Sequence, residues 1–310
     1  MQMSLLLIQG DIDPVRVEAQ CRAHQWLGLP PGFSVQHQHA LLADGMMLLS
    51  SKADHAKPSC ERLAQDLALD VNPLNPNRSW SDFGMAAFDM DSTLIDMECI
   101  DEMAAMAGCG AEVAAITEAA MRGELTDYDD SLRRRVRLLK GQDFSSMQKQ
   151  IQQKLRLNPG VGRLTQTMSA QGLKLVVLSG GFHPIVDLVA KSIGADACRA
   201  NQLGTEGNKI DGRLIGDIVN AKAKAAFLES FANQWGLHTR QCIAIGDGAN
   251  DLAMMALAGL SACYRAKPVV SAKATLSFFA SGLDAMLDHF VETRRPSLTR
   301  AIESLREPTP

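Results

Sequence analysis

The sequence predicts an α/β protein with a parallel β-sheet, a helical insertion, and a small α+β module near the N-terminus. Apolar runs alternate with helical patterns along the larger, second part of the chain. The runs end at Asp89, Ser179 and Asp247, and the helical patterns span 184–193, 221–235 and 250–258. This alternation is typical of parallel strands covered by helices. The interval 98–158 interrupts it with an almost wholly helical pattern, which predicts an inserted cap.

The first 72 residues predict a module of their own. Strand patterns at 4–9, 34–42 and 46–51 combine with helical patterns at 14–26 and 59–69. This order favours a small α+β domain, ACT-like or ferredoxin-like, and a regulatory role is one interpretation of it. The segment 71–78 then contains two prolines, which disfavour both helix and sheet. We therefore expect a linker over 73–83.

The rest of the chain divides around the cap. We expect one core domain formed by 84–97 and 159–295, with the cap at 98–158 and a C-terminal tail at 296–310. The glycine-rich stretch 203–216 predicts a β-hairpin. A length of 310 residues agrees with about two domains.

Composition and charge favour a soluble enzyme. Apolar residues make up 46% of the chain and charged residues 21%, which is near the average for globular proteins. The net charge of −4 gives no reason to expect binding to nucleic acid or to an anionic membrane. The seven cysteines form no C-x-x-C pair, so we expect reduced thiols and a cytoplasmic location. The apolar run Leu5–Ile8 is too short for a signal peptide or a membrane span. Assembly into a homodimer is left open.

Two carboxylates stand two positions apart where the first apolar run ends, in Asp89-Met-Asp-Ser-Thr93. Residues two apart in a strand share a face, so Asp89 and Asp91 can converge beyond the strand end. They repel each other there unless a cation lies between them. A hard ion such as Mg²⁺ prefers oxygen ligands and can screen this repulsion. One Asp can then attack phosphorus while the other moves a proton. Taken alone, the motif is equally compatible with an ordinary turn.

Three further elements support phosphate chemistry. Leu173–Leu178 is followed by Ser179-Gly-Gly, where the glycines and a helix start near Pro184 can hold phosphate. Another apolar run ends in Gly246-Asp-Gly-Ala-Asn-Asp251. Lys222, at the start of a helical pattern, can neutralise phosphate or the attacking carboxylate. The structural alternatives are a strand-to-helix turn, a loop, and a solvated lysine.

These motifs, in this order and spacing, resemble the haloacid dehalogenase superfamily of phosphatases. More narrowly, Glu98, Ser131-Leu-Arg-Arg-Arg-Val136 and Ser179-Gly-Gly-Phe resemble its phosphoserine phosphatase family. The resemblance covers about residues 84–290. It implies a Rossmann-like parallel sheet as the core, with an inserted helical cap.

The resemblance implies a role for each motif residue. Asp89 would be the nucleophile that forms an aspartyl-phosphate, and Asp91 would be the general acid and base. Mg²⁺ would be held by Asp89, Asp247 and the backbone carbonyl of Asp91, supported from the outer shell by Asn250 and Asp251. The phosphate would be bound by Ser179, Gly180, Lys222 and Asn250, and Lys222 would offset charge during catalysis.

Substrate choice would come from the cap. Phosphoserine carries an ammonium and a carboxylate, so the site should supply one acid and one bidentate base. Glu98 and Arg135 match the positions that serve this purpose in the family. Successive helical residues point about 100° apart, so the three consecutive arginines cannot share a direction. We expect Arg133 and Arg134 to be solvated.

The implied activity is hydrolysis of O-phospho-L-serine to L-serine and phosphate, the last step of serine biosynthesis. The same motifs also permit a phosphotransferase or a phosphatase of another small phosphomonoester. A non-catalytic regulatory protein that binds a phospho-ligand is disfavoured, because binding alone has no use for Asp91.

Overall fold

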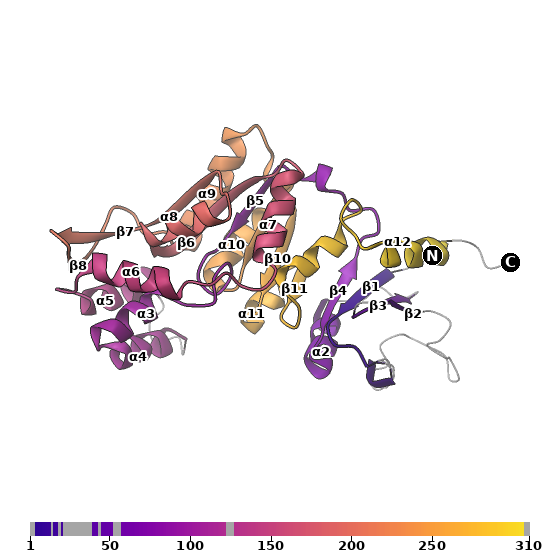
Figure 1. Ribbon diagram of the computed structural model, residues 1–310, viewed down its shortest axis with the longest axis horizontal. Helices are drawn as coiled ribbons and strands as arrows, with labels where there is room; N and C mark the ends of the chain where they lie inside the picture. Colours follow the sequence, from indigo (N-terminus) through magenta and orange to yellow (C-terminus); the bar gives the residue numbers. More distant parts are fainter. Residues whose placement is uncertain are drawn as a thin grey trace.

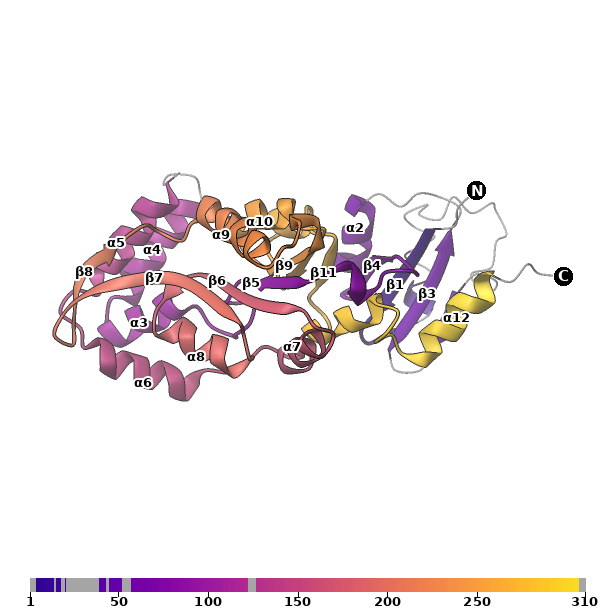
Figure 2. The ribbon, with the colours of Figure 1, turned by 90° about the horizontal axis from the view of Figure 1, so that it is seen from above.

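The computed structural model describes residues 4–13, 15–17, 20, 39–42, 45–51, 57–121 and 127–306. Two β-sheets organise it along the long axis of the molecule (Figures 1 and 2). The larger sheet has the strand order β11-β10-β9-β5-β6-β7-β8, and the smaller has the order β2-β3-β1-β4. The cap helices lie at one end of the larger sheet and the smaller sheet lies at the other.

The larger sheet confirms the predicted α/β fold. At its centre, β5 (Met85–Phe88) pairs in parallel with β6 (Lys174–Phe182) and β9 (Cys242–Gly246). Further parallel neighbours are β7 (Ala197–Glu206), β10 (Leu260–Tyr264) and β11 (Leu276–Phe278). Because these strands run in parallel, the carboxyl ends of β5, β6 and β9 meet at one edge of the sheet, where ligands of such folds bind.

Helices cover both faces of this sheet, and this explains why its strands read as continuous apolar runs. They are α7 (Val161–Ala170), α8 (Ile185–Ser192), α9 (Ala221–Gln234), α10 (Leu252–Leu257) and the short α11 (Pro268–Ser271). Ala86 and Phe88 of β5 join the core cluster that includes residues of α7 and α8. Met85 and Ala87 join the opposite cluster with residues of α9 and α10.

The predicted cap is a group of four helices within the described residues of 98–158. They are α3 (Cys99–Ala107), α4 (Gly110–Met121), α5 (Tyr128–Leu138) and α6 (Phe144–Lys154). Asn158 fastens the base of the cap, because its Nδ2 donates to the backbone carbonyls of Ser92, Thr93 and Ile95 at 2.9–3.1 Å.

The predicted β-hairpin is also present. β7 continues into the antiparallel β8 (Lys209–Ile215), and the pair reaches the cap (Figure 1). The Gly141 and Phe144 N–H groups of the cap donate to the carbonyls of Ile210 and Asn208 at 2.7 and 2.8 Å. The hairpin therefore fixes the cap to the core at a second place.

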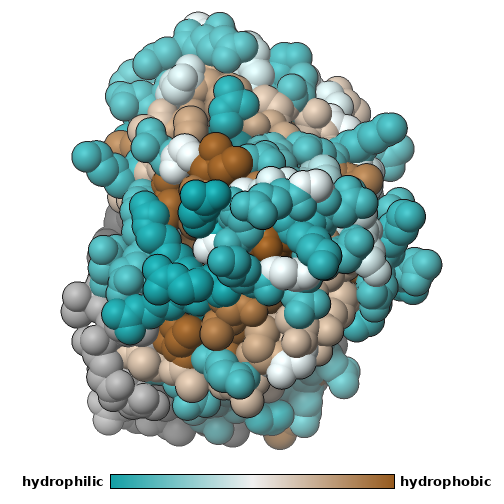
Figure 3. Space-filling view, turned by 90° about the vertical axis from the view of Figure 1, so that its left-hand side faces the viewer, coloured by the Kyte–Doolittle hydropathy of each residue, from teal (hydrophilic) through white to brown (hydrophobic). Residues whose placement is uncertain are grey.

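The end of the molecule that carries the cap is mostly hydrophilic (Figure 3). Apolar residues appear there in separate areas and not as one broad face, among the described residues that this view shows. In the described part of the chain, every helix is too short or too polar to cross a membrane.

The smaller sheet belongs to the N-terminal module. Its strands are β1 (Ser4–Gln9), β2 (His39–Leu42), β3 (Met46–Ser51) and β4 (Asp70–Leu74), all antiparallel, with α2 at Lys57–Leu67. Most of the predicted helix 14–26 and of the strand start 34–38 lies outside the described residues. The strand order agrees with a ferredoxin-like arrangement, and the ACT-like assignment stays a prediction.

The expected linker is partly wrong, because β4 extends into it as far as Leu74. Pro73 is part of this strand and lies opposite Leu6 of β1. A proline is compatible with β4 because β4 is an edge strand, where one side of the backbone needs no ladder partner.

The expected C-terminal tail is also wrong over most of its length. Residues Pro296–Arg306 form α12, which packs on the smaller sheet (Figure 2). Leu298 and Ile302 of α12 contact the cluster that contains Leu7, while Leu6 faces the opposite cluster with α2 residues. Both faces of this sheet are thus buried, and this explains why β1 is apolar at consecutive positions.

Side chains of β4 join the module to the core. Asn72 accepts from the Ser277 N–H at 2.7 Å and donates to the Ser277 carbonyl at 2.9 Å, so its amide imitates a backbone partner for β11. The buried Asp70 carboxylate accepts the N–H groups of Phe279, Ala280 and Ser281 at 2.7–2.9 Å. The two sheets are therefore held in one orientation by buried polar contacts.

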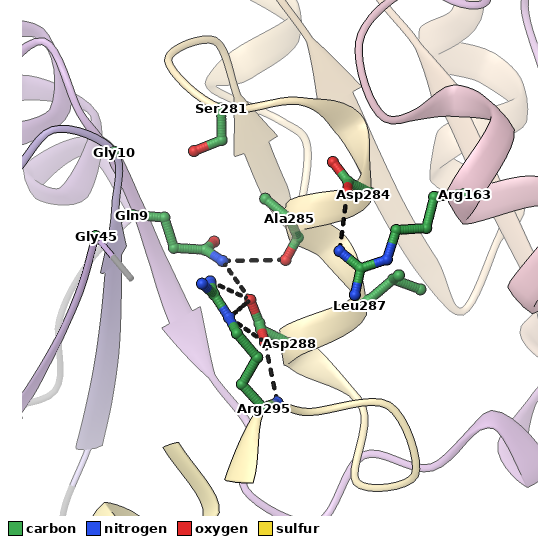
Figure 4. Close-up of a pocket in the computed structure, with 10 residues that line it drawn as sticks. All are labelled: Gln9, Gly10, Gly45, Arg163, Ser281, Asp284, Ala285, Leu287, Asp288 and Arg295. Carbon is green, nitrogen blue, oxygen red and sulfur yellow. Dashed lines mark hydrogen bonds and ion pairs between the residues drawn. The ribbon is translucent and has the colours of Figure 1, made fainter. Parts of the chain in front are cut away.

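A polar cavity of about 260 Å³ lies at the same junction (Figure 4). Gln9 Nε2 donates to Asp288 Oδ2 at 3.0 Å, and Arg295 pairs with Asp288 at 2.6 Å. Arg163 and Asp284 form a further ion pair at 3.1 Å on the wall formed by the core. Both arginines thus already have carboxylate partners. The contact of Gln9 with Asp288 connects the module with the core, whereas the pair of Arg163 and Asp284 joins two segments of the core.

Asp70→Ala should lower the free energy of unfolding by about 3 kcal/mol or more. Three N–H groups would lose a buried, charged acceptor, and each hydrogen bond to a charged group contributes roughly 1.5–3 kcal/mol. Asp70→Asn should have a smaller effect, because one acceptor oxygen remains. Chemical denaturation measures the difference, with the exposed Asp217→Ala as a control expected within about 0.5 kcal/mol of the original protein. Equal stability of Asp70→Ala and the control would contradict this role.

Candidate active site

A cavity of about 1010 Å³ lies between the cap and the carboxyl ends of β5, β6 and β9. The predicted site residues that line it are Asp89, Asp91, Glu98, Arg135, Gly180, Lys222, Asp247 and Asn250. Ser179 and Asp251 are fully buried. The structure thus gathers residues that are up to 161 positions apart in the sequence, Asp89 and Asn250, around one cavity.

Asp89 directly follows β5, and its N–H donates to the carbonyl of Ile245 in β9 at 2.8 Å. Its side chain is 9% exposed, and Oδ1 lies 2.5 Å from Nζ of the fully buried Lys224. Burial and the nearby Asp251 raise the pKa of Asp89 well above its ordinary value, while Lys224 acts against this rise. A bound cation would favour the charged, nucleophilic form of Asp89.

The lysine at this position is Lys224, and the prediction of Lys222 is corrected. Lys224 Nζ also bonds Asp251 Oδ1 at 2.7 Å. Burial lowers the pKa of Lys224, but the Asp251 and Asp89 carboxylates outweigh this effect and raise it, so the ammonium stays charged. Lys222 is exposed at the rim of the cavity and forms no ion pair among the described residues.

Helix geometry explains why the two lysines differ. The residues of α9 that face the core are Lys224, Leu228, Phe231 and Ala232. Their spacing of three to four is that of one helix face. Lys222 precedes Lys224 by two residues, about 200° around the helix, and therefore points away from the core.

Asp91 lies in the loop after β5, and its side chain is held by the start of α3. The Cys99 N–H donates to Asp91 Oδ1 at 3.3 Å. Burial, followed by the neighbouring Glu98 carboxylate, raises the pKa of Asp91 to about 7. A carboxyl group with this pKa can hold a proton near neutral pH and release it again, which is the requirement for a general acid and base.

Asp247, Asp89 and Asp251 form a cluster in which one carboxylate oxygen of each lies within 4.8 Å of the others. Thr93 Oγ1 donates to Asp247 Oδ1 at 2.8 Å. Burial raises the pKa of Asp247 to about 7, an effect that Thr93 opposes and Asp251 reinforces. When all three carboxyl groups are ionised, they carry more negative charge than the single Lys224 ammonium can balance.

This excess of buried carboxylate oxygen fits a divalent cation. Hard cations bind such oxygens and compensate their charge. Asp251 is the least available of the three as a direct ligand, because Oδ1 holds Lys224 and Oδ2 accepts the N–H groups of Asp247 and Gly248. The Asp89 and Asp247 carboxylates are therefore the better placed of the three to contact such an ion.

The Ser179-Gly-Gly segment has a different local structure from the one expected. A helix does start near Pro184 as expected, because α8 begins at Ile185, but β6 continues through both glycines to Phe182, so the segment is the end of a strand and not a turn that leads directly into the helix. The pairing of β6 with β7 is irregular between Leu178 and Phe182. Ser179 Oγ accepts the Gly181 N–H at 2.9 Å, so the backbone folds around the buried hydroxyl.

Both glycines are needed because the backbone is crowded on the cavity side. A Cβ atom at Gly180 would lie 2.4 Å from the Tyr128 hydroxyl, and one at Gly181 would lie 3.1 Å from Asp91 Oδ2. A side chain at Gly180 would therefore displace the Tyr128 hydroxyl of the cap. Glycine therefore leaves the Gly180 amide accessible from the cavity.

The cap contributes Glu98 and Arg135 as predicted. Glu98 Oε1 accepts from Ser92 Oγ at 2.7 Å. Arg135 is half-buried, and its buried Nε has no hydrogen-bond partner among the residues that the structure describes. Arg133 and Arg134 are exposed, and Arg134 forms only a surface ion pair with Asp130 at 2.8 Å. The structure thus turns one arginine of the run toward the cavity.

Sequence reasoning gave no role to Thr93, Lys224 or Asn220. Thr93 holds Asp247, and Asn220 Nδ2 donates to Asp129 of α5 at 3.0 Å, a contact between core and cap. Asn220 also caps α9 by accepting the Ala223 N–H at 3.0 Å. The available signals were the threonine in the first aspartate motif and an asparagine just before a helical pattern.

Fold and site together are those of a hydrolase with paired aspartates at the carboxyl edge of a parallel sheet. The chain belongs to the haloacid dehalogenase-like hydrolase family, whose family model matches residues 86–256. It is 49% identical over 224 residues to a phosphoserine phosphatase of Polaromonas sp., a match that covers 71% of this chain and 95% of that protein.

Solved structures resemble nearly the whole chain. A probable phosphoserine phosphatase from Vibrio cholerae has a TM-score of 0.73 at 31% identity, with 97% of this chain and 88% of that one covered. A haloacid dehalogenase family hydrolase from Salmonella enterica has a TM-score of 0.77 at 26% identity, with 94% and 99% covered.

Proposed function

We propose that the chain hydrolyses O-phospho-L-serine to L-serine and phosphate, the last step of serine biosynthesis. The observation that carries the proposal is one cavity with a phosphoryl-transfer end and an amino-acid end. Asp89 and its partner Lys224 lie at the phosphoryl-transfer end. Arg135, whose Nε has no partner among the described residues, lies at the amino-acid end. The identity with phosphoserine phosphatases supports this substrate.

At the phosphoryl end, Asp89 attacks phosphorus and forms an aspartyl-phosphate, while Asp91 donates its proton to the departing serine oxygen. Water then attacks the intermediate, and Asp91 takes up a proton. The Ser179 hydroxyl and the Gly180 amide bind phosphate oxygens. Lys224 holds the Asp89 carboxylate in place and balances charge, and Asn250 contacts the phosphate from the cavity wall.

The metal that we propose is Mg²⁺. Asp89, Asp247 and the backbone carbonyl of Asp91 would hold it, supported by Asn250 and Asp251. When bound, the ion supplies positive charge that offsets the negative charge of the phosphate and the carboxylates. Lys224 and the amide donors supply the remaining compensation.

At the amino-acid end, the cap supplies both charges that phosphoserine needs. Glu98 would bind the substrate ammonium and Arg135 the carboxylate. Both side chains line the same cavity as Asp89. The unpartnered Arg135 Nε supports this role, because a buried donor without a partner is rare and a carboxylate would satisfy it.

We also propose a reducing, cytoplasmic location. Among the described residues, Cys99, Cys109, Cys198 and Cys242 are free thiols, and free thiols are typical of that compartment. The homodimer stays a prediction.

Phosphate release from a panel of phosphomonoesters tests the proposed function. Phosphoserine should have the highest kcat/KM, phosphothreonine should be a weak substrate, and EDTA should abolish turnover until Mg²⁺ is restored. A different preferred substrate would overturn the assignment of phosphoserine. Full activity in EDTA would overturn the assignment of a metal cofactor. Release of serine without an equal amount of phosphate, when another alcohol is present, would indicate a phosphotransferase.

Arg135→Ala should lower kcat/KM for phosphoserine by about tenfold to a hundredfold. The loss corresponds to one charge-assisted hydrogen bond of roughly 1.5–3 kcal/mol. Arg134→Ala is the matched control and should change kcat/KM by less than about threefold, because Arg134 is solvated. Phosphoethanolamine has no carboxylate, so Arg135→Ala should affect its turnover much less. Equal losses on both substrates would show that Arg135 supports the cap and does not read the substrate.

Mg²⁺ should raise the melting temperature more at pH 8 than at pH 5. The pKa values of Asp89 and Asp247 lie above those of the unfolded chain, so without metal the folded state binds more protons between about pH 4 and pH 7. Stability of the metal-free protein therefore falls as pH rises through that window. Mg²⁺ binds the deprotonated carboxylates and relieves this penalty. Thermal unfolding with Mg²⁺ or EDTA measures the effect, and an equal gain at both pH values would contradict it.

A further inference from the structure

A second group of metal-binding side chains lies outside the catalytic cavity. It consists of His183, Asp187 and Cys198, whose potential ligand atoms all lie within 4.8 Å of one another. His183 directly follows β6, Asp187 lies in the first turn of α8, and Cys198 lies in β7. β6 and β7 are neighbouring strands of the larger sheet, and α8 packs on one face of it (Figure 2). None of the three residues lines the catalytic cavity.

The three side chains converge through hydrogen bonds. His183 Nδ1 and Asp187 Oδ1 are 2.7 Å apart, and Cys198 Sγ donates to the same carboxylate oxygen at 3.3 Å. The backbone holds them in place, because the His183 N–H donates to the Asn201 carbonyl of β7 at 3.0 Å. The ligand atoms of a tetrahedral Zn²⁺ site, with bonds of about 2.0–2.3 Å, lie roughly 3.3–3.8 Å apart. Shifts of less than about 1 Å would reach this spacing.

We propose that His183, Asp187 and Cys198 form a binding site for Zn²⁺ or a similar borderline divalent ion. Their nitrogen, oxygen and sulfur donors are the set that Zn²⁺ prefers, whereas the catalytic cluster offers oxygen alone, which suits Mg²⁺. Side-chain exposures of 28% for His183 and 48% for Asp187 leave the fourth position to water. The metal would join β6, α8 and β7 next to the Ser179-Gly-Gly segment.

Binding of the metal would release one proton from the protein. Without metal, burial and the Asp187 carboxylate raise the pKa of Cys198 to about 11, so the thiol keeps its proton. Binding of the ion would form three protein–metal bonds, with His183 neutral and Asp187 deprotonated, and would release the Cys198 proton to solvent. The neighbouring Arg199 does not compete for the position, because its guanidinium lies over the Phe231 ring at 4.8 Å.

Zn²⁺ binding to the full chain in excess Mg²⁺ tests the proposal. Mg²⁺ occupies the catalytic carboxylates, and a chromogenic chelator then competes for Zn²⁺ at the second site. We expect one tight equivalent, weakened at least about tenfold in Cys198→Ser and in His183→Gln. Replacing Zn²⁺ by Co²⁺ should give a thiolate-to-cobalt absorption band that Cys198→Ser removes. This experiment does not depend on the proposed phosphatase activity.

Cys109→Ser is the matched control, because Cys109 is a partly exposed thiol of the cap outside this cluster. It should leave the affinity and the cobalt band unchanged. Failure to bind Zn²⁺ in excess Mg²⁺, or an affinity that Cys198→Ser and His183→Gln do not change, would overturn the proposal. Circular dichroism of the metal-free variants separates loss of the site from loss of the fold. Asp187→Asn gives an independent test where either variant is unfolded.

Discussion

Asp89→Asn should abolish phosphoserine hydrolysis, with kcat lower by at least about 10⁴-fold. The amide has no charge with which to attack phosphorus, so no covalent intermediate can form. The fold should persist, because the amide oxygen can still accept from Lys224 Nζ in the position of Asp89 Oδ1. Steady-state kinetics gives the loss, and acid quenching during turnover shows whether phosphate is trapped on the protein.

Thermal unfolding in EDTA provides the control for this variant. Burial raises the pKa of Asp89, which means that its charged form is unfavourable in the metal-free protein. A neutral isostere should therefore be at least as stable as the original. Phosphate trapped on Asp89→Asn, or on another residue of the original protein, would contradict the assignment of the nucleophile.

Asp91→Asn separates the second carboxylate from the first. It leaves Asp89 in place, so p-nitrophenyl phosphate, whose leaving group needs no proton, should keep far more activity than phosphoserine. Equal losses on both substrates would assign Asp91 to the structure of the site instead of to proton transfer.

Periodicity and strand-end motifs predicted the core well, because those signals are local. The apolar run before Asp89 is the buried strand β5, and the runs before Ser179 and Asp247 are its neighbours β6 and β9. Once these strands are known to be parallel, their carboxyl ends must share an edge. The position of Asp89, Asp91 and Asp247 at one cavity follows from that geometry alone.

The errors arose where tertiary contacts decide the outcome. The local sequence around Pro73 is typical of a linker. This segment forms β4 because it pairs with β1, which lies far away in the sequence, at the edge of the sheet. From the sequence alone, the residues of α12 were expected to be part of a C-terminal tail. In the structure α12 covers one face of a sheet formed by strands within the first 75 residues. No local pattern in residues 296–306 indicates that one face of the smaller sheet would be exposed to solvent without α12.

The choice of lysine was a third kind of error, and the sequence did contain the information to avoid it. Lys222 stands closer to the helix start, where a charge facing phosphate is expected. The spacing of Lys224 to Leu228 and Phe231 instead places Lys224 on the buried face of α9. A lysine in phase with the apolar residues of a helix must find a buried partner, and Asp89 and Asp251 are those partners.

Lys224→Met should lower kcat by roughly 10²–10³-fold, the range for removing one preorganised charge from an active site. It should also destabilise the folded protein by about 3–5 kcal/mol at neutral pH, because the buried Asp89 and Asp251 carboxylates both lose the ammonium group that contacts them. Part of this loss should be recovered at lower pH, where Asp89 and its neighbours can take up protons. Enzyme kinetics and chemical denaturation at two pH values measure both effects.

Lys222→Met is the matched control, since it removes the same charge two residues earlier on the same helix. Lys222 is exposed at the cavity rim, so kcat should change by less than about threefold and stability by less than about 0.5 kcal/mol. Lys224→Arg should fail to restore activity, because a larger guanidinium has no room at a fully buried position with two carboxylates in contact. The reverse pattern, with Lys222→Met inactive and Lys224→Met active, would return the charge-balancing role to Lys222 and show that the buried ion pair only holds α9 against the core.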